Sequence, residues 1–317
     1  MLKAIALAAA FAALAACADD KTAGPPQKRD GFIETDDGVS LYYVEKGSGS
    51  QTLIAPMALY LEPHLLDALS KNRRVIFYDP RNRGRSDAAD LSAVSLDRQI
   101  EDLENLRAAL GVEEMALLGW SGPGMETAVY AMRHPARVTR LIQMSPVPPA
   151  ASIMRENQDD RNNRIDADAL ADIDARAGAG EIDSEPEAFC RRVNAATNPA
   201  NFVDPALTAK VPDVCVYENE WPKNLWKYFG AFLPTFGDYD WREDIGDFTA
   251  PRLVLHGKED GIPLAGAEAW VRGHDNARLI VLSPSGHMPF IEQRDAAIET
   301  IETFLNGDWP DNAETLN

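Results

Sequence analysis

Three side chains of the kinds that transfer acyl groups occur far apart in the sequence: Ser121, Asp260 and His287. A serine hydroxyl is a weak nucleophile until a base takes its proton, and an imidazole base works best when a carboxylate orients it. Each of the three follows a short apolar run typical of a buried strand, and open α/β sheets place their ligands at strand ends. The spacing therefore predicts a nucleophile, an orienting carboxylate and a general base that act on ester or amide carbonyls.

The surroundings of Ser121 are typical of a nucleophile elbow. Residues 119–124 read G-W-S-G-P-G and join an apolar run to a helix-like stretch. A sharp turn between small residues lifts the serine hydroxyl above the sheet. The N–H of Gly122 would then lie at a helix N-terminus, where backbone dipoles favour an oxyanion. We predict that Gly122 forms part of the oxyanion hole, and that Trp120 contacts substrate.

Strands and helices alternate around these residues. Short apolar runs occupy residues 52–55, 74–78, 115–119, 139–144, 252–256 and 278–282. A segment of alternating polarity at 32–45 turns at Asp37-Gly38 and predicts a hairpin. The stretch 95–110 carries one apolar stripe, with Ser95 as its N-cap. The alternation predicts a doubly wound, mostly parallel sheet.

Three further motifs give a specific resemblance. Residues 79–86 read D-P-R-N-R-G-R-S, residues 256–263 read H-G-K-E-D-G-I-P, and residues 286–292 read G-H-M-P-F-I-E. With the elbow, they resemble the serine hydrolase branch of the α/β-hydrolase superfamily over roughly residues 32–305. The resemblance implies an α/β-hydrolase fold in which Ser121 is the nucleophile and His287 the base. It implies that Asp260, rather than Glu259, orients the base, that His256 lies in the core and that no cofactor is needed. It also implies that the backbone N–H of Met57, which follows Ala55-Pro56 in place of the family's His-Gly, is the second donor of the oxyanion hole. No Cys/His spacing resembles a zinc site, so we expect no metal.

The interval 147–248 contains no convincing β-like run and is too long for a loop. It predicts a helical cap inserted into a core of residues 31–146 and 249–306, which an acidic tail at 307–317 follows. Residues 217–222 and 237–242 resemble the cap of bacterial proline iminopeptidases, in which cap carboxylates hold a substrate's amino terminus. Glu218 or Glu220 would have that role here, and solvated surface carboxylates are the alternative.

Three functional hypotheses follow. The first is a serine hydrolase that cleaves a small ester or amide, and the second is an N-terminal aminopeptidase of the proline iminopeptidase type. Against the second, Ala55-Pro56 replaces the His-Gly-Gly-Pro loop typical of those enzymes. The third is a non-catalytic envelope lipoprotein scaffold, supported only by Ala55-Pro56 and by Pro123, which follows the elbow where glycine is usual. Proline is tolerated in a first helical turn.

The first seventeen residues predict export. A single Lys3 precedes an apolar run at 4–16, which is shorter than the ~20 residues of a spanning helix. The ending L-A-A-C resembles the bacterial lipoprotein box, which implies acylation of Cys17 and a membrane contact through the lipid. An ordinary signal peptide cut near this point is the alternative. Residues 18–30 would be a polar tether, and the location would be the bacterial cell envelope.

Composition limits the partners. The 317 residues carry 31 Lys+Arg against 50 Asp+Glu, a formal charge of −19, which argues against a nucleic-acid partner. The expected partner is a small-molecule or short peptide substrate, and the sequence leaves the oligomeric state open. In an oxidising compartment Cys190 and Cys215 would pair, and two separate buried thiols are the alternative.

Overall fold

The computed structural model describes residues 27–156 and 164–316, in which eight strands form one sheet. The strands are β1 (Arg29–Glu34), β2 (Ser40–Lys46), β3 (Thr52–Pro56), β4 (Arg74–Tyr78), β5 (Met115–Trp120), β6 (Val138–Met144), β7 (Arg252–Gly257) and β8 (Ala277–Leu282). Their order is β1-β2-β4-β3-β5-β6-β7-β8. All neighbours from β4 to β8 in that order pair in parallel, and β2 is antiparallel to both β1 and β4. The predicted fold class is confirmed.

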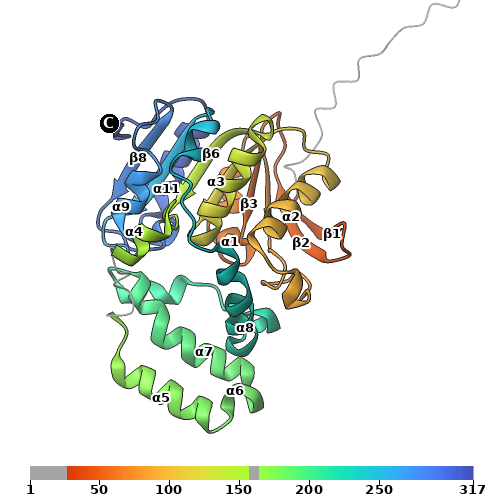
Figure 1. Ribbon diagram of the computed structural model, residues 1–317, viewed down its shortest axis with the longest axis vertical. Coiled ribbons are helices and arrows are strands. Elements are labelled where there is room, and N and C mark those ends of the chain that lie inside the picture. The colour runs from red at the N-terminus through yellow and green to blue at the C-terminus, as the bar shows by residue number, and fades with distance from the viewer. Residues whose placement is uncertain (1–26, 157–163, 317) are drawn as a thin grey trace, which may run out of the picture.

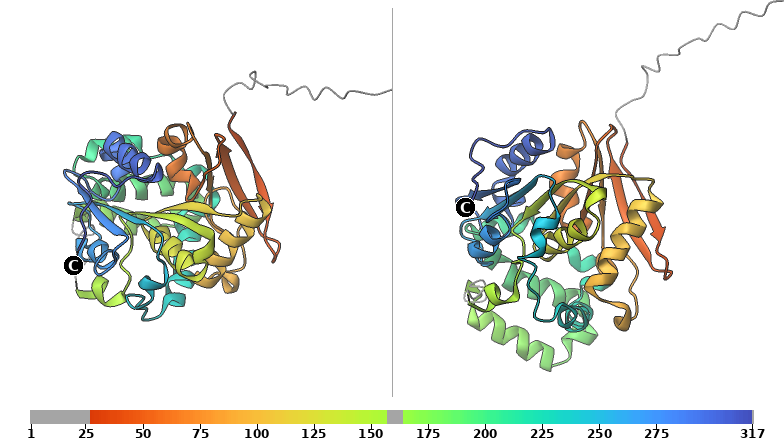
Figure 2. Two further views of the ribbon diagram at one scale, coloured as in Figure 1. Left: turned by 90° about the horizontal axis from the view of Figure 1, so that it is seen from above. Right: turned by 45° about the horizontal axis from the view of Figure 1, so that its top comes forward.

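Helices cover both faces of this sheet (Figure 2). One face packs against α1 (Ala58–Leu69), α10 (Pro289–Glu292) and α11 (Arg294–Leu305), in a core that contains Leu65, Phe290 and Phe304. The other face packs against α2 (Leu96–Ala109), α3 (Gly122–Arg133) and α9 (Leu264–Ala269). Two apolar layers therefore hold the sheet rigid, and its strand ends provide a firm base for a site.

Helix α2 forms as its sequence predicts. The hydroxyl of Ser95 accepts a hydrogen bond from the backbone N–H of Arg98 at 3.1 Å and so caps the first turn. The apolar stripe, represented by Ile100 and Leu103, is buried against the sheet. Strand β5 is buried at all six positions, as expected for a parallel strand covered on both sides.

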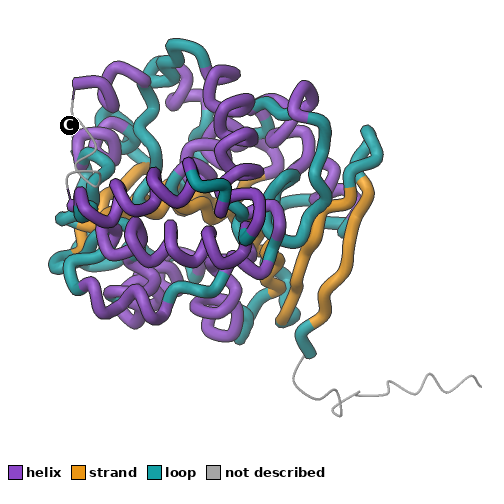
Figure 3. Tube along the Cα trace, turned by 90° about the horizontal axis from the view of Figure 1, so that it is seen from below, coloured by secondary structure: helices purple, strands orange, loops and turns teal. Residues whose placement is uncertain are grey.

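The segment between β6 and β7 is mainly helical. It contains α4 (Ala151–Glu156), α5 (Ala167–Gly178), α6 (Glu181–Ser184), α7 (Pro186–Thr197) and α8 (Pro222–Phe232). Figure 1 shows α5 to α8 gathered at one end of the molecule, and Figure 3 shows how much of the chain is helical. A disulfide joins Cys190 in α7 to Cys215. We use the word cap for residues 147–248.

The predicted signal peptide, Cys17 and most of the predicted tether lie outside the described residues. Within residues 27–156 and 164–316, none of the helices combines the length and the apolar character that crossing a membrane requires.

Candidate active site

Ser121 lies in a strained turn between β5 and α3. Its φ is 62° and its ψ is −129°, a conformation that side chains rarely adopt. Gly119 makes the turn possible, because a Cβ at this position would lie 2.3 Å from the carbonyl oxygen of Pro123. The turn is held by the Ser121 N–H, which donates to the carbonyl of Met144 at 3.0 Å. The sequence G-W-S-G-P-G therefore folds as the predicted elbow.

Ser121, His287 and Asp260 form one continuous hydrogen-bonded chain. The Oγ of Ser121 lies 3.0 Å from Nε2 of His287, and Nδ1 of His287 lies 3.0 Å from both oxygens of Asp260. Asp260 follows β7, and His287 lies in the loop between β8 and α10. Because an ionised carboxylate only accepts hydrogen bonds, Nδ1 must carry the proton, which leaves Nε2 free to accept the proton of the serine hydroxyl.

The surroundings keep Asp260 ionised. Burial opposes its negative charge, but the charge and hydrogen bond of His287, the charge of His256 and the N–H of Ile262 together hold the pKa of the Asp260 carboxyl well below its ordinary value. That N–H donates to Oδ1 at 2.9 Å. His256 itself is buried, as expected, and burial lowers its pKa. Its Nε2 donates to the carbonyl of Ile262 at 3.1 Å.

Glu259, the competing carboxylate, does not contact the base. It accepts hydrogen bonds from the Ser283 hydroxyl at 3.0 Å and from the Ser285 N–H at 2.8 Å. These contacts brace the loop that carries His287.

The predicted oxyanion donors lie on adjacent segments. Gly122 is the first residue of α3, whose first turn has N–H groups without intrahelical acceptors. Met57 lies between β3 and α1 in the left-handed conformation, with φ 72°. β3 and β5 are parallel neighbours, with Ile54 opposite Leu117, so Met57 and Ser121 follow the same ends of two adjacent strands.

Asp79, a residue that sequence reasoning did not single out, holds the Met57 loop. It is buried, and it accepts hydrogen bonds from the N–H of Leu59 at 2.8 Å and from the N–H of Arg85 at 3.1 Å. Gly84 is needed beside it, because a Cβ there would lie 2.5 Å from the Asp79 carboxylate. The motif at 79–86 was the available signal.

Trp120 supports the base. It is buried, its indole N–H donates to the carbonyl of His287 at 2.8 Å, and the two rings lie 5.3 Å apart. Its other face meets Tyr60 at 5.4 Å. The predicted substrate contact at Trp120 is therefore largely covered by protein.

The two predicted amine anchors in the cap have different surroundings. Glu220 is buried and accepts both ends of the Arg83 guanidinium at 2.9 Å, together with the Gly84 N–H at 2.8 Å. Glu218 is exposed to solvent. The carboxylate of Glu220 is thus bonded to a residue 137 positions away, which no local pattern could show. The predicted role of Glu218 stays a prediction.

A different carboxyl lies beside the nucleophile. Glu126 lies one turn into α3, and its Oε1 is 3.7 Å from where a Cβ on Gly122 would be. Burial raises the pKa of Glu126 to about 7, although the charge of Arg83 acts in the opposite direction. Sequence reasoning missed this residue, and an acid five positions after the nucleophile was the only signal.

The cap is bonded to the loop of the base. The carbonyl of Asn201 accepts the N–H of His287 at 2.8 Å. Glu292 accepts the N–H of Val203, also in the cap, at 2.7 Å, and its other oxygen accepts the N–H of Gly286. The segment after α7 therefore helps to position the imidazole.

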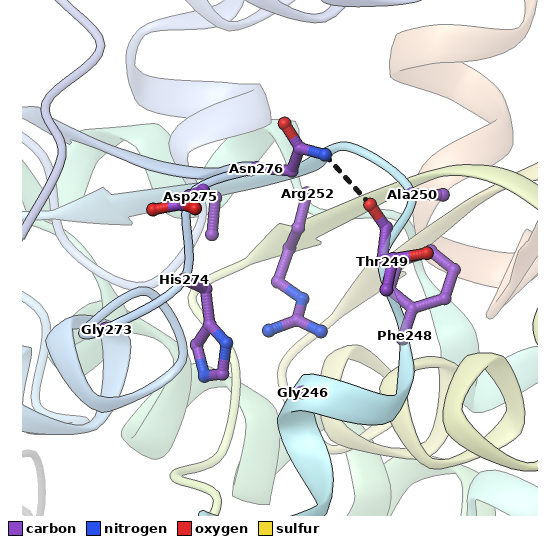
Figure 4. Close-up of a pocket in the computed structure, with 10 residues that line it drawn as sticks. Gly246, Phe248, Thr249, Ala250, Arg252, Gly273, His274, Asp275 and Asn276 are labelled. Carbon is purple, nitrogen blue, oxygen red and sulfur yellow. Dashed lines mark hydrogen bonds between the residues drawn. The ribbon is translucent and has the colours of Figure 1, made fainter.

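A cavity lies at the amino end of β7, opposite the end that leads to Asp260. This cavity of about 260 Å³ has the buried guanidinium of Arg252 in its wall (Figure 4). The guanidinium donates to the carbonyls of Trp270 at 2.9 Å and Ile245 at 3.3 Å. In the part of the chain that the structure describes, Nε of Arg252 has no hydrogen-bond partner. In the same ranges, no group of three acidic, histidine or cysteine side chains could hold a metal.

Comparisons with known proteins agree with this geometry. The family model described as alpha/beta hydrolase fold matches residues 55–293. A proline iminopeptidase from Heyndrickxia coagulans is 26% identical over 292 residues, which cover 87% of this chain and 98% of the relative. One from Clostridium botulinum is 27% identical over 250 residues, or 76% of this chain and 84% of the relative. The crystal structure of a hydrolase from Pseudomonas aeruginosa PA01 has a TM-score of 0.64 and 25% identity, and the match covers 88% of this chain and 98% of that one. The chain belongs to the α/β hydrolase fold family.

Proposed function

We propose that the protein is a serine hydrolase that cleaves a small ester or amide through an acyl-enzyme. Ser121 attacks the carbonyl carbon while Nε2 of His287 takes the hydroxyl proton. The negative charge moves to the carbonyl oxygen, which the N–H groups of Gly122 and Met57 stabilise, each by about 3 kcal/mol in the transition state. Asp260 stabilises the imidazolium that forms.

The second half of the cycle uses the same groups. The imidazolium of His287 gives its proton to the leaving alcohol or amine as the bond to the acyl carbon breaks. His287 then takes a proton from the water that attacks the acyl carbon, and it gives that proton to Oγ of Ser121 as the acyl–oxygen bond breaks and the acid leaves. The chain's own residues perform each of these proton transfers.

One observation carries this proposal: the unbroken chain of 3.0 Å contacts from Ser121 through His287 to Asp260. A fluorophosphonate probe tests it, because such probes react with an activated serine. We expect labelling of the wild type, unchanged labelling of the exposed control Ser92→Ala, and none of Ser121→Ala. Labelling that persists in Ser121→Ala would place the nucleophile elsewhere.

A second candidate is an N-terminal aminopeptidase, which the names of the two curated relatives favour. The pairing of Glu220 with Arg83 counts against Glu220 as the amine anchor. Rates on p-nitrophenyl butyrate and on proline p-nitroanilide separate the two. A higher kcat/KM for the anilide would make the aminopeptidase the better description. The scaffold hypothesis predicts neither activity, and the complete chain of hydrogen bonds argues against it.

We also propose that the protein is exported and held at the cell envelope by a lipid on Cys17. The disulfide between Cys190 and Cys215 supports an oxidising compartment. Metabolic labelling with an alkyne fatty acid should mark the wild type and should not mark Cys17→Ser. Equal labelling of both would refute the lipid anchor.

A further inference from the structure

The carboxyl of Glu126 has no partner of its own at the nucleophile. The described residues offer it neither a hydrogen bond nor an ion pair, although Ser121, Gly122 and Glu126 all retain some exposed surface. A carboxyl left half-buried and unpaired is costly for a fold. It is also the group a binding site would offer to a substrate.

Its neighbours cannot neutralise it. The charged and titratable groups that interact with Glu126 are Arg83, Tyr78 at the end of β4 and Tyr228 in α8. Both ends of the Arg83 guanidinium are bonded to Glu220. The phenol oxygen of Tyr228 accepts a hydrogen bond from Gln99 at 3.2 Å. Glu220 therefore matches the positive charge of Arg83, and the negative charge that Glu126 carries when ionised has no such partner among the described residues.

The position of Glu126 indicates which part of the substrate it would contact. The leaving group must face His287, which protonates it and which lies beyond β7 and β8. Arg83 and Tyr78, which interact electrostatically with Glu126, follow or end β4, on the opposite side of β5 in the sheet. The acyl chain is therefore the part that extends towards Glu126.

We propose that Glu126 is a specificity-determining residue whose carboxyl contacts the acyl chain of the substrate and selects a positively charged group when it is ionised. This inference rests on the proposed acyl-enzyme chemistry. Because burial raises the pKa of Glu126 to about 7, the selection changes near neutral pH. The ionised carboxylate attracts a cationic acyl chain, and the protonated carboxyl accepts a neutral one.

Two esters of the same shape test the proposal. p-Nitrophenyl 4-(trimethylammonio)butanoate carries a fixed positive charge, and p-nitrophenyl 5,5-dimethylhexanoate has carbon in place of the nitrogen. The readout is the ratio of their kcat/KM values between about pH 5.5 and about pH 8.5, a range that spans the titration of a carboxyl with a raised pKa. The proteins are the wild type, Glu126→Gln and the control Glu113→Gln, which removes an exposed charge at the amino end of β5.

In the wild type we expect the ratio to rise at least tenfold with pH, with a midpoint near neutrality. Glu126→Gln should lower the ratio at the higher pH at least tenfold and make it independent of pH. It should still hydrolyse the neutral ester, which shows that it folds, and Glu113→Gln should behave as the wild type does.

An unchanged ratio in an active Glu126→Gln would overturn this inference and leave the proposed function intact. A wild type that hydrolyses neither ester and is not labelled at Ser121 would overturn both. Labelling therefore tells the two failures apart.

Discussion

Two carboxyl groups belong to the active site, one behind the base and one near the nucleophile, and their surroundings differ. Asp260 has two hydrogen-bonded partners, the imidazole of His287 and the N–H of Ile262, and its pKa lies well below the ordinary value. Glu126 has no bonded partner, and burial raises its pKa to about 7. Both have lost much of their contact with water, so the difference comes from partners rather than from burial.

The comparison shows how one site assigns separate tasks to the same chemical group. A carboxylate that is fully bonded keeps one charge and one geometry, which suits the orientation of a base. A carboxyl without partners changes its charge near neutral pH, and it remains free to interact with a ligand. Four substitutions test whether paired and unpaired buried charges differ in this way.

The largest effect is expected on the paired side. Asp260→Asn should lower kcat about 10⁴-fold, because an amide N–H facing Nδ1 favours the tautomer that cannot accept the serine proton. Steady-state hydrolysis of a neutral p-nitrophenyl ester measures it, with the melting temperature as the folding control. A well-folded Asp260→Asn variant that kept a tenth of the wild-type activity would show that the ionised, bonded carboxylate is not needed to orient the base.

The next effect is on the ion pair between cap and core. Glu220→Gln leaves the buried guanidinium of Arg83 without a counter-charge, so we expect a loss of about 3–5 kcal/mol in the free energy of unfolding. Urea denaturation measures this loss. The exposed neighbour Glu218 supplies the matched control, since Glu218→Gln should change the free energy by no more than about 0.5 kcal/mol. Equal effects of the two would mean that Glu220 is not an essential partner.

On the unpaired side, substitution should stabilise the protein. The folded state holds the Glu126 proton up to a pKa of about 7, compared with 4.5 for the free side chain, so stability falls as the pH rises between these values. Glu126→Gln should therefore raise the free energy of unfolding by up to about 3 kcal/mol at pH 8 and leave it unchanged near pH 4. Urea melts at the two pH values check this. Destabilisation at the higher pH would show that Glu126 has a partner.

The smallest effect is expected at Arg252, the unpaired counterpart of Arg83. Arg252→Met removes a buried charge whose pKa burial lowers to about 10, but it also leaves the carbonyls of Trp270 and Ile245 without their donor. Removal of the buried charge should stabilise the fold and loss of the two hydrogen bonds should destabilise it. The free energy of unfolding should therefore change by less than about 2 kcal/mol in either direction. A larger loss in the free energy of unfolding would mean that Arg252 is as important for stability as Arg83.

The sequence predicts what local patterns encode. The continuous apolar run of β5 and the small residues at 119–124 predict the elbow, and the order of Ser121, Asp260 and His287 predicts the triad of residues that the structure brings together. The stripe and N-cap of α2 are equally local.

Features that depend on contacts between residues far apart in the sequence cannot be predicted from local patterns. Glu220 has the same local surroundings as Glu218, and only the folding of the cap onto the 79–86 loop distinguishes the buried residue from the exposed one. In the sequence, Glu126 is indistinguishable from an ordinary helical glutamate. Only the folded structure brings Tyr228 of α8 near its carboxyl. In both cases the decisive information is burial by a segment far away in the chain.

The hydrogen bond from the His287 N–H to the carbonyl of Asn201 has a consequence for how ligands enter. Hinged lids in many enzymes swing away while the catalytic machinery stays in place, but here such a swing would detach the imidazole loop from its backbone support. Movement of the cap to admit a ligand would therefore also disturb the position of the catalytic imidazole. A compound that displaced residues 198–203 outward would lower turnover without contacting Ser121.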